Sequence, residues 1–306
     1  MMFFIIYKKD DGLAYKVNPG LDFKHYYFQL TAKYRIIDPI YIKKRVPGSF
    51  FENKSLLNLI KGVGSNKPEF KGESPVKTIA NNLLFNHFKP EKGFLISPEE
   101  RDKYGTIVDL AVRNGLKKLN PSRNNLVILE AKSQSGDPWH KLMAQGMEYS
   151  RNTYIGRGKS CFFIALKGTY IAFFVVDPKF HYENQFIFKG EDSHGLIGLV
   201  CYKGKVQPLP QKDIHIPQMY PFDLNSKNLA ELHSIHYILS WMSRFVEAPY
   251  VEYNDTTESY SFKGGKLIPS PKQGKKFVLK GPNHTKPRVS TEVHKLLTKN
   301  PKVFRG

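Results

Sequence analysis

Cysteine and long hydrophobic runs are both scarce in this chain of 306 residues. Its two cysteines, Cys161 and Cys201, each stand in an apolar, strand-like run, which favours a reduced compartment over a disulfide-stabilised fold. The longest apolar run near the start, residues 1–7, is too short to span a membrane and lacks the cleavage pattern of a signal peptide. We therefore expect an intracellular protein, nuclear or cytoplasmic, without a transmembrane segment.

Several chemical signatures are missing as well. The ten histidines form no metal-ligand spacing with the two cysteines, so a zinc site is not expected. Neither a Gly-x-Ser-x-Gly motif nor a reactive-cysteine context occurs, which argues against acyl-transfer chemistry. The chain also has no repeat of fixed period, and this argues against a solenoid.

Acidic residues are too few to balance the basic ones: 27 Asp and Glu stand against 47 Lys and Arg, a formal charge of +20. Such an excess indicates a polyanionic partner, which can be nucleic acid, an acidic membrane surface or an acidic protein. Residues 261–306 contain twelve Lys or Arg and one acid, Glu292, and so carry +11 of the total. This segment is rich in Gly and Pro and has few periodic apolar residues. We predict a basic, flexible tail over 251–306, which either solubilises the protein or serves as a nucleic-acid-binding or nuclear-targeting arm.

The remaining sequence predicts a mixed α/β protein, with a central sheet flanked by helices. Aromatic and β-branched runs before residue 65 indicate a β-rich N-terminal extension, and residues 66–250 form the predicted core. Ser74 and Pro75 predict a helix start, with Ser74 as its cap. The expected core elements, in chain order, are a helix from 74, strands over 106–112 and 126–132, a helix from 137, a hairpin of 161–166 with 171–176, strands over 185–188 and 196–202, and a helix over 226–246.

Three charged residues interrupt the two predicted central strands. Asp109 breaks an apolar alternation, and Glu130 and Lys132 share one face at the end of the next strand. Burying charges is unfavourable unless they pair or hold a metal. If the strands pair, the three side chains converge. Two carboxylates suit Mg²⁺, and a lysine beside them suits phosphodiester hydrolysis, whereas the structural alternative is an ion-pair network without catalytic consequence.

The surroundings of this cluster favour the catalytic interpretation. Glu73 begins the preceding helix, and Gln145 and Tyr149 lie four residues apart on the following one. The order resembles the PD-(D/E)XK phosphodiesterase superfamily, which has the restriction-endonuclease-like fold. The Gln145-x-x-x-Tyr149 helix makes it similar to the RecB-like and lambda-exonuclease-like branch. The resemblance covers residues 73–176, about a third of the chain, and Val108 stands where many members have Pro.

The resemblance implies specific roles for these residues. Asp109 and Glu130 resemble the metal ligands, with Glu73 as an accessory acid, and Lys132 resembles the catalytic lysine. Glu99 and Glu100, on the connector, compete with Glu73 for the accessory position. Gln145 and Tyr149 would line the site. The implied cofactor is Mg²⁺ or Mn²⁺.

Nucleic acid is the implied partner, with DNA favoured over RNA. The residues expected to contact it are Lys141, Arg157, Lys159, Lys275 and Lys276. The leading hypothesis is therefore a metal-dependent nuclease. Two alternatives remain: a nucleic-acid-binding protein on the same fold that does not cut, and an interaction protein whose basic tail binds an acidic partner.

Overall fold

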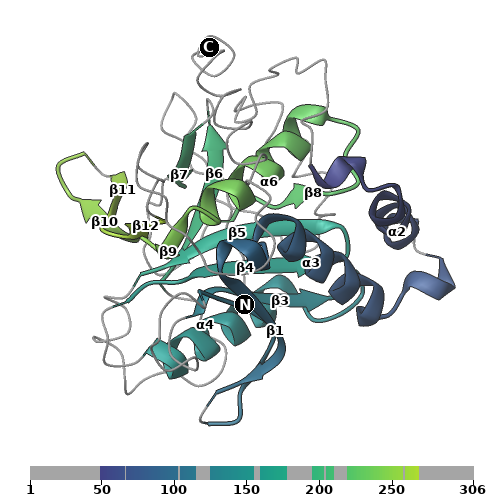
Figure 1. The fold of residues 1–306 in the computed structure, drawn as a ribbon, viewed down its shortest axis with the longest axis horizontal. Coiled ribbons are helices and arrows are strands. Elements are labelled where there is room, and N and C mark those ends of the chain that lie inside the picture. Colours follow the sequence, from purple (N-terminus) through teal and green to yellow (C-terminus); the bar gives the residue numbers. More distant parts are fainter. Residues whose placement is uncertain are drawn as a thin grey trace.

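A mixed β-sheet with helices on both faces organises the molecule (Figure 1). The computed structural model describes residues 49–268, apart from 66, 103, 115–124, 155–158, 178–194, 203–204, 210–218 and 258. Within these residues the main sheet has eight strands in the order β1-β2-β3-β4-β5-β6-β7, and β8 also pairs with β5. Its strands are β1 (Phe94–Arg101), β2 (Ile107–Asn114), β3 (Asn125–Lys132), β4 (Phe162–Lys167), β5 (Tyr170–Val176), β6 (Leu196–Tyr202), β7 (Lys205–Pro208) and β8 (Phe222–Asp223).

The pairing of β3 with β4 is the parallel one, whereas the other pairings within this sheet are antiparallel. A parallel pair needs a long crossover connection, because the chain must return to the end of the sheet at which the first strand began. Helix α4 (Trp139–Tyr154) supplies this crossover. The end of β3 and the start of α4 therefore lie at the same edge of the sheet.

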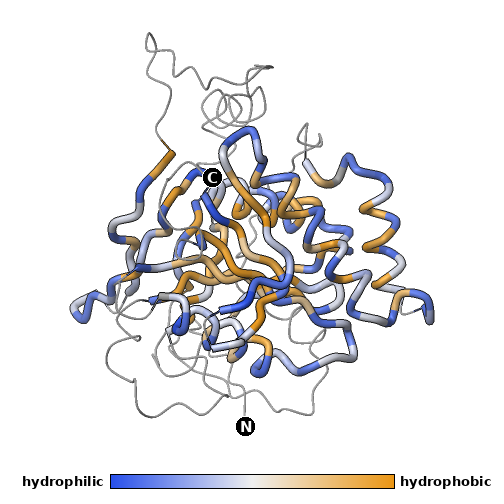
Figure 2. The backbone as a smooth tube through the Cα atoms, turned by 60° about the horizontal axis from the view of Figure 1, so that its bottom comes forward, coloured by the Kyte–Doolittle hydropathy of each residue, from blue (hydrophilic) through white to orange (hydrophobic). Residues whose placement is uncertain are grey.

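Helices cover both faces of the sheet. Helices α3 (Glu73–His87) and α6 (Leu229–Met242) cover one face of the sheet. Together with the side chains of that face they form one apolar cluster, which includes Ile79 of α3 and Leu129 of β3. Helix α4 covers the other face, where a second apolar cluster includes Met147 of α4 and Ile128 of β3. Adjacent residues of β3 thus face opposite layers, as expected of a strand. The central strands are correspondingly the most hydrophobic part of the backbone (Figure 2).

The remaining elements lie beside this core. Helix α2 (Lys54–Gly64) packs on α3, and three short 3-10 turns precede or follow these helices: η1 (Phe50–Glu52), η2 (Pro68–Phe70) and η3 (Pro90–Lys92). After α6, β9 (Phe245–Glu247) pairs with β12 (Lys266–Leu267), and β10 (Tyr250–Asn254) pairs with β11 (Ser259–Lys263). Among the described helices, none combines the length and apolarity needed to cross a membrane.

The mixed α/β architecture predicted from the sequence is confirmed. The strands expected over 106–112 and 126–132 pair antiparallel, as β2 and β3, and the hairpin of β4 and β5 is also present. Helix α3 begins at Glu73 with Gly72 as its N-cap, so the predicted Ser74 cap is wrong. Pro75 is accommodated because the first-turn N–H groups have no partner within the helix. The strand predicted over 185–188 lies outside the described residues.

The predicted flanking segments lie mostly outside the described residues, and the described part of each differs from its prediction. The described part of the N-terminal extension, 49–65, is helical rather than β-rich, because Leu56, Ile60 and Val63 recur at helical spacing and bury one face of α2 in the main core. At the other end, residues 251–268 belong to strands β10, β11 and β12, so the predicted flexible tail does not begin at 251. Residues 1–48 and 269–306 lie outside the described residues.

Candidate active site

The two carboxylates predicted to converge lie at one end of the paired central strands. Strands β2 and β3 pair as far as Leu110 opposite Leu129, so Asp109 and Glu130 come directly beyond this last pair. Glu130 faces the α4 side of the sheet, because its neighbours Leu129 and Ala131 both belong to the cluster on the α3 side, whereas Asp109 reaches Lys77 of α3. The antiparallel pairing therefore brings together acids that stand 21 positions apart in the sequence.

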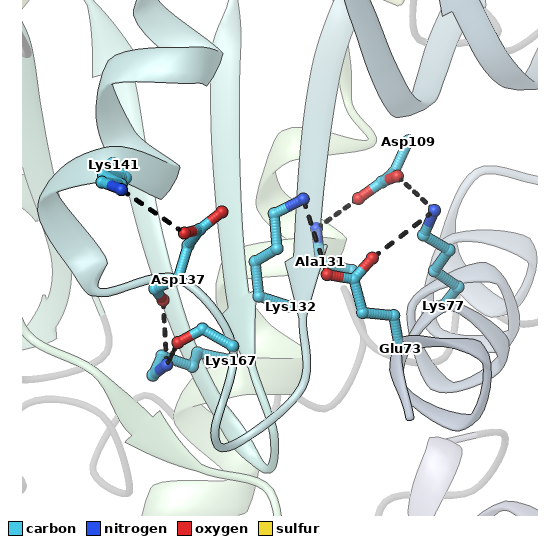
Figure 3. A network of polar contacts seen from close by, with 9 residues as sticks. Glu73, Lys77, Asp109, Ala131, Lys132, Asp137, Lys141 and Lys167 are labelled. Carbon is cyan, nitrogen blue, oxygen red and sulfur yellow. Dashed lines mark hydrogen bonds and ion pairs between the residues drawn. The ribbon is translucent and has the colours of Figure 1, made fainter. Parts of the chain in front are cut away.

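Both oxygens of Asp109 are already engaged (Figure 3). Oδ1 lies 2.7 Å from the Lys77 ammonium of α3, and Oδ2 accepts a hydrogen bond of 2.8 Å from the backbone N–H of Ala131. The second bond fixes the carboxylate to β3 itself. Asp109 also acts on Lys77, because its hydrogen bond and charge raise the pKa of that ammonium against the opposing effect of burial. Lys77 is therefore held in its charged form.

Glu130 is the most deeply buried acid of the group, with 2% of its surface exposed. Its Oε1 has no hydrogen-bond partner within the described part of the chain. Burial raises the pKa of Glu130 well above its usual range, and the neighbouring Asp109 charge raises it further, while Lys132 lowers it. A buried carboxylate with an unpartnered oxygen requires a proton or a cation. This orphaned atom is the observation that fits a metal ligand.

Glu73 links the two lysines of the site. Its Oε1 lies 3.7 Å from Nζ of Lys132, and its Oε2 lies 3.9 Å from Nζ of Lys77, one helical turn further along α3 (Figure 3). The Glu73 side chain is 41% exposed and so stands at the open side of the cluster. The predicted residues Glu73, Asp109, Glu130 and Lys132 are thus brought together. The arrangement is not a preformed metal site, because among the described residues no three His, Cys, Asp or Glu side chains lie close enough to hold a metal ion.

The two residues that compete with Glu73 for the role of accessory acid lie elsewhere than expected. Glu99 and Glu100 belong to strand β1, not to a connector. Glu100 forms an ion pair with Arg113 of β2 and is thereby committed to the pairing of these two strands. Glu99 has a positive φ of 46°, and its charge contributes to the raised pKa of Lys77. Glu73 remains the acid that contacts Lys132.

The structure does not bring Tyr149 to the carboxylates. Its hydroxyl accepts a hydrogen bond of 3.2 Å from the side-chain amide of Asn125, at the start of β3. Asn125 and Glu130 are five strand positions apart, about 16 Å at the usual rise. Gln145 lies one turn closer to the site along α4, and its Oε1 is buried without a hydrogen-bond partner among the described residues.

Two lysines of this region, Lys77 and Lys167, are not among the residues predicted from the sequence. Lys167 of β4 pairs in register with Lys132, and its ammonium donates to the carbonyls of Gly136 and Asp137 at 2.7 and 2.9 Å (Figure 3). It thereby holds the turn between β3 and α4. The spacing of Glu73 and Lys77 at i and i+4 was a detectable signal for the first lysine, whereas only the parallel register reveals the second.

The residues predicted to contact nucleic acid are only partly described. Lys141 is exposed near the start of α4, 3.8 Å from Asp137. Lys159 is paired with Glu247 of β9 at 3.0 Å, which ties the segment before β4 to the region after α6. Arg157, Lys275 and Lys276 lie outside the described residues. Comparison with models of protein families, with curated proteins and with solved structures finds no match for this chain.

Proposed function

We propose that this protein is a divalent-metal-dependent nuclease with a restriction-endonuclease-like core of the PD-(D/E)XK type. The observation that supports this most strongly is the placement of Asp109, Glu130 and Lys132 at one end of two paired central strands, with Glu130 Oε1 buried and without a hydrogen-bond partner among the described residues. The order of α3, β2, β3, α4 and β4, with β4 parallel to β3, agrees with the resemblance found in the sequence. DNA is the favoured substrate over RNA.

Asp109 and Glu130 would hold Mg²⁺ or Mn²⁺, with Glu73 as an accessory ligand. When bound, such a cation would supply an activated water and stabilise charge on the phosphate oxygens. The ammonium of Lys132 lies on the same strand face as Glu130 and would orient the attacking water or stabilise the developing negative charge. Glu73, which lies 3.7 Å from that ammonium, would keep it directed toward the carboxylates.

Cleavage assays test the proposal directly. Purified protein is incubated with single- and double-stranded DNA and RNA in Mg²⁺, Mn²⁺ or EDTA, beside the variants Lys132→Ala and Asp109→Asn. We expect metal-dependent cleavage that both variants abolish while their melting curves stay cooperative. Lys263→Ala is the control, because this lysine pairs with Glu252 on the β10–β11 hairpin and should retain full activity. Undiminished cleavage by Lys132→Ala would overturn the assignment.

A non-catalytic nucleic-acid-binding protein on the same fold is the second candidate. It is favoured by the engagement of both Asp109 oxygens, one by an ammonium and one by a backbone N–H. Binding to DNA in EDTA, together with no cleavage of any of the four substrates in Mg²⁺ or Mn²⁺, would select this candidate over the nuclease.

A further inference from the structure

Lys77 is the unexplained charge of the candidate site. It projects from α3, the helix on the opposite side of the sheet from α4, and its ammonium contacts Asp109 at 2.7 Å (Figure 3). The same ammonium lies 3.9 Å from Glu73. It has no place in the catalytic pattern that the sequence resembles. Its contacts nevertheless involve two of the three acids assigned to the metal.

A divalent cation bound by Asp109 would compete with this ammonium, in its present position, for the charge of the same carboxylate. Mg²⁺ binds carboxylate oxygens at about 2.1 Å, which is closer than the ammonium lies to Oδ1. The other oxygen of Asp109 is held by the N–H of Ala131, a backbone group that cannot withdraw without disturbing β3. A cation at Asp109 would therefore meet strong repulsion from Lys77 at short range.

Lys77 is able to move aside. Its side chain is 37% exposed, so its ammonium has a route to solvent, and its long stem allows several rotamers. Glu73 lies one turn earlier on α3 and offers it a second carboxylate. A withdrawn ammonium would thus keep an ionic partner while Asp109 becomes available.

We propose that Lys77 is a displaceable internal counter-ion of the metal site, which neutralises Asp109 until a divalent cation takes its place. This inference rests on the proposed metal-binding function. It makes Lys77 a positioning residue rather than a catalytic one, since it acts through Asp109. Metal binding then includes the breakage of the Lys77–Asp109 ion pair, and the affinity of the site is lower than its carboxylates alone would give.

The test measures Mn²⁺ binding to the full chain by titration calorimetry, without nucleic acid. Lys77→Met removes the charge and keeps a side chain of similar length, whereas Lys77→Arg keeps the charge. Lys263→Met is the matched control, because it removes one surface ammonium from another ion pair, that with Glu252. We expect Lys77→Met to bind Mn²⁺ roughly tenfold more tightly than the wild type, and the other two variants to stay within about twofold.

Thermal melting supplies an independent readout. Without metal, Lys77→Met leaves the Asp109 charge uncompensated and should melt at a lower temperature than the wild type, and saturating Mn²⁺ should raise its midpoint more. Lys77→Gln keeps a hydrogen-bond donor for Asp109 without the charge, so it replaces Lys77→Met in both measurements if that variant does not fold in the absence of metal.

The outcomes separate the two proposals. If the wild type binds Mn²⁺ through Asp109 but the uncharged Lys77 variants bind it no more tightly, the counter-ion inference is wrong and the metal site stands. If Asp109→Asn and wild type bind Mn²⁺ equally or not at all, both the metal site and the counter-ion inference fail.

Discussion

Glu231 gives the sharpest test of the electrostatics of the fold. It lies in the first turn of α6, is 3% exposed, and its Oε1 accepts a hydrogen bond of 2.6 Å from the backbone N–H of Asp223 in β8. Burial raises the pKa of Glu231 from its ordinary value of 4.5 to about 8, although the hydrogen bond to Asp223 opposes this. The folded protein therefore holds a proton that the unfolded chain releases at neutral pH.

The sign and size of the effect follow from linkage. Since the folded-state pKa is raised, the contribution of Glu231 to stability is largest below pH 4.5 and falls as the pH rises from there to about 8. Each pKa unit corresponds to about 1.4 kcal/mol, so the shift amounts to about 5 kcal/mol in all, of which about 3 kcal/mol is already lost at pH 7. Glu231→Gln keeps the acceptor for Asp223 and removes the ionisation.

Urea unfolding at pH 5, 7 and 9 measures this effect. The stability gain of Glu231→Gln over the wild type should grow from about 1 kcal/mol at pH 5 to about 3 at pH 7 and 4–5 at pH 9. Glu69→Gln, at an exposed position in η2, is the control and should show no such trend. A gain of equal size at all three pH values would refute the reasoning, because it would mean that Glu231 does not retain its proton in the folded state.

Three further predictions concern the packing of the helices. Burial lowers the pKa of His87 to about 4 and of His236 to about 2, and their rings are hydrogen-bonded at 2.9 Å. The stability that the pair contributes is complete above about pH 6.5 and falls as the pH drops, toward pH 4 for His87 and toward pH 2 for His236. His236→Gln should therefore reduce the slope of urea stability against pH below pH 6 by about 1.4 kcal/mol per unit. A Cβ at Gly146 would overlap the ring of Phe163, so Gly146→Ala should lower the free energy of unfolding by about 3 kcal/mol, and Phe163→Leu should relieve part of this in a double-mutant cycle. Tyr149→Phe should lower the free energy of unfolding in urea by about 1 kcal/mol and leave the affinity for Mn²⁺ unchanged. A large loss of affinity would show that Tyr149 belongs to the metal site after all.

The part of the site that the sequence predicted depends on local patterns. Asp109 and Glu130 stand out because each interrupts an apolar strand, and strand alternation then decides which side Glu130 faces. The pairing of consecutive strands as neighbours is the commonest arrangement, so their convergence was a sound prediction. Glu73 at the head of α3 was also predictable, because the helical spacing of buried Val76 and Ile79 fixes the position of the helix.

The rest depends on how distant elements pack. The contact of Lys77 with Asp109 requires the position of α3 against the sheet, which periodicity does not supply. Tyr149 follows Gln145 by one turn, and only the direction of α4 along β3 shows that this turn leads away from the carboxylates. Strand β1 was missed because Pro98 and the charges after it are typical of a loop.

The composition of β1 affects the tendency of the protein to aggregate through the edge of its sheet. Among the described strands, β1 ends the sheet on one side, and unpaired backbone groups at such an edge can recruit a strand from a second chain. Pro98 offers no N–H, and Glu99, with its φ of 46°, departs from strand geometry. Glu100 and Arg101 add charge to the same stretch. These features discourage the pairing of a further strand on β1, and so protect this edge from aggregation through backbone pairing.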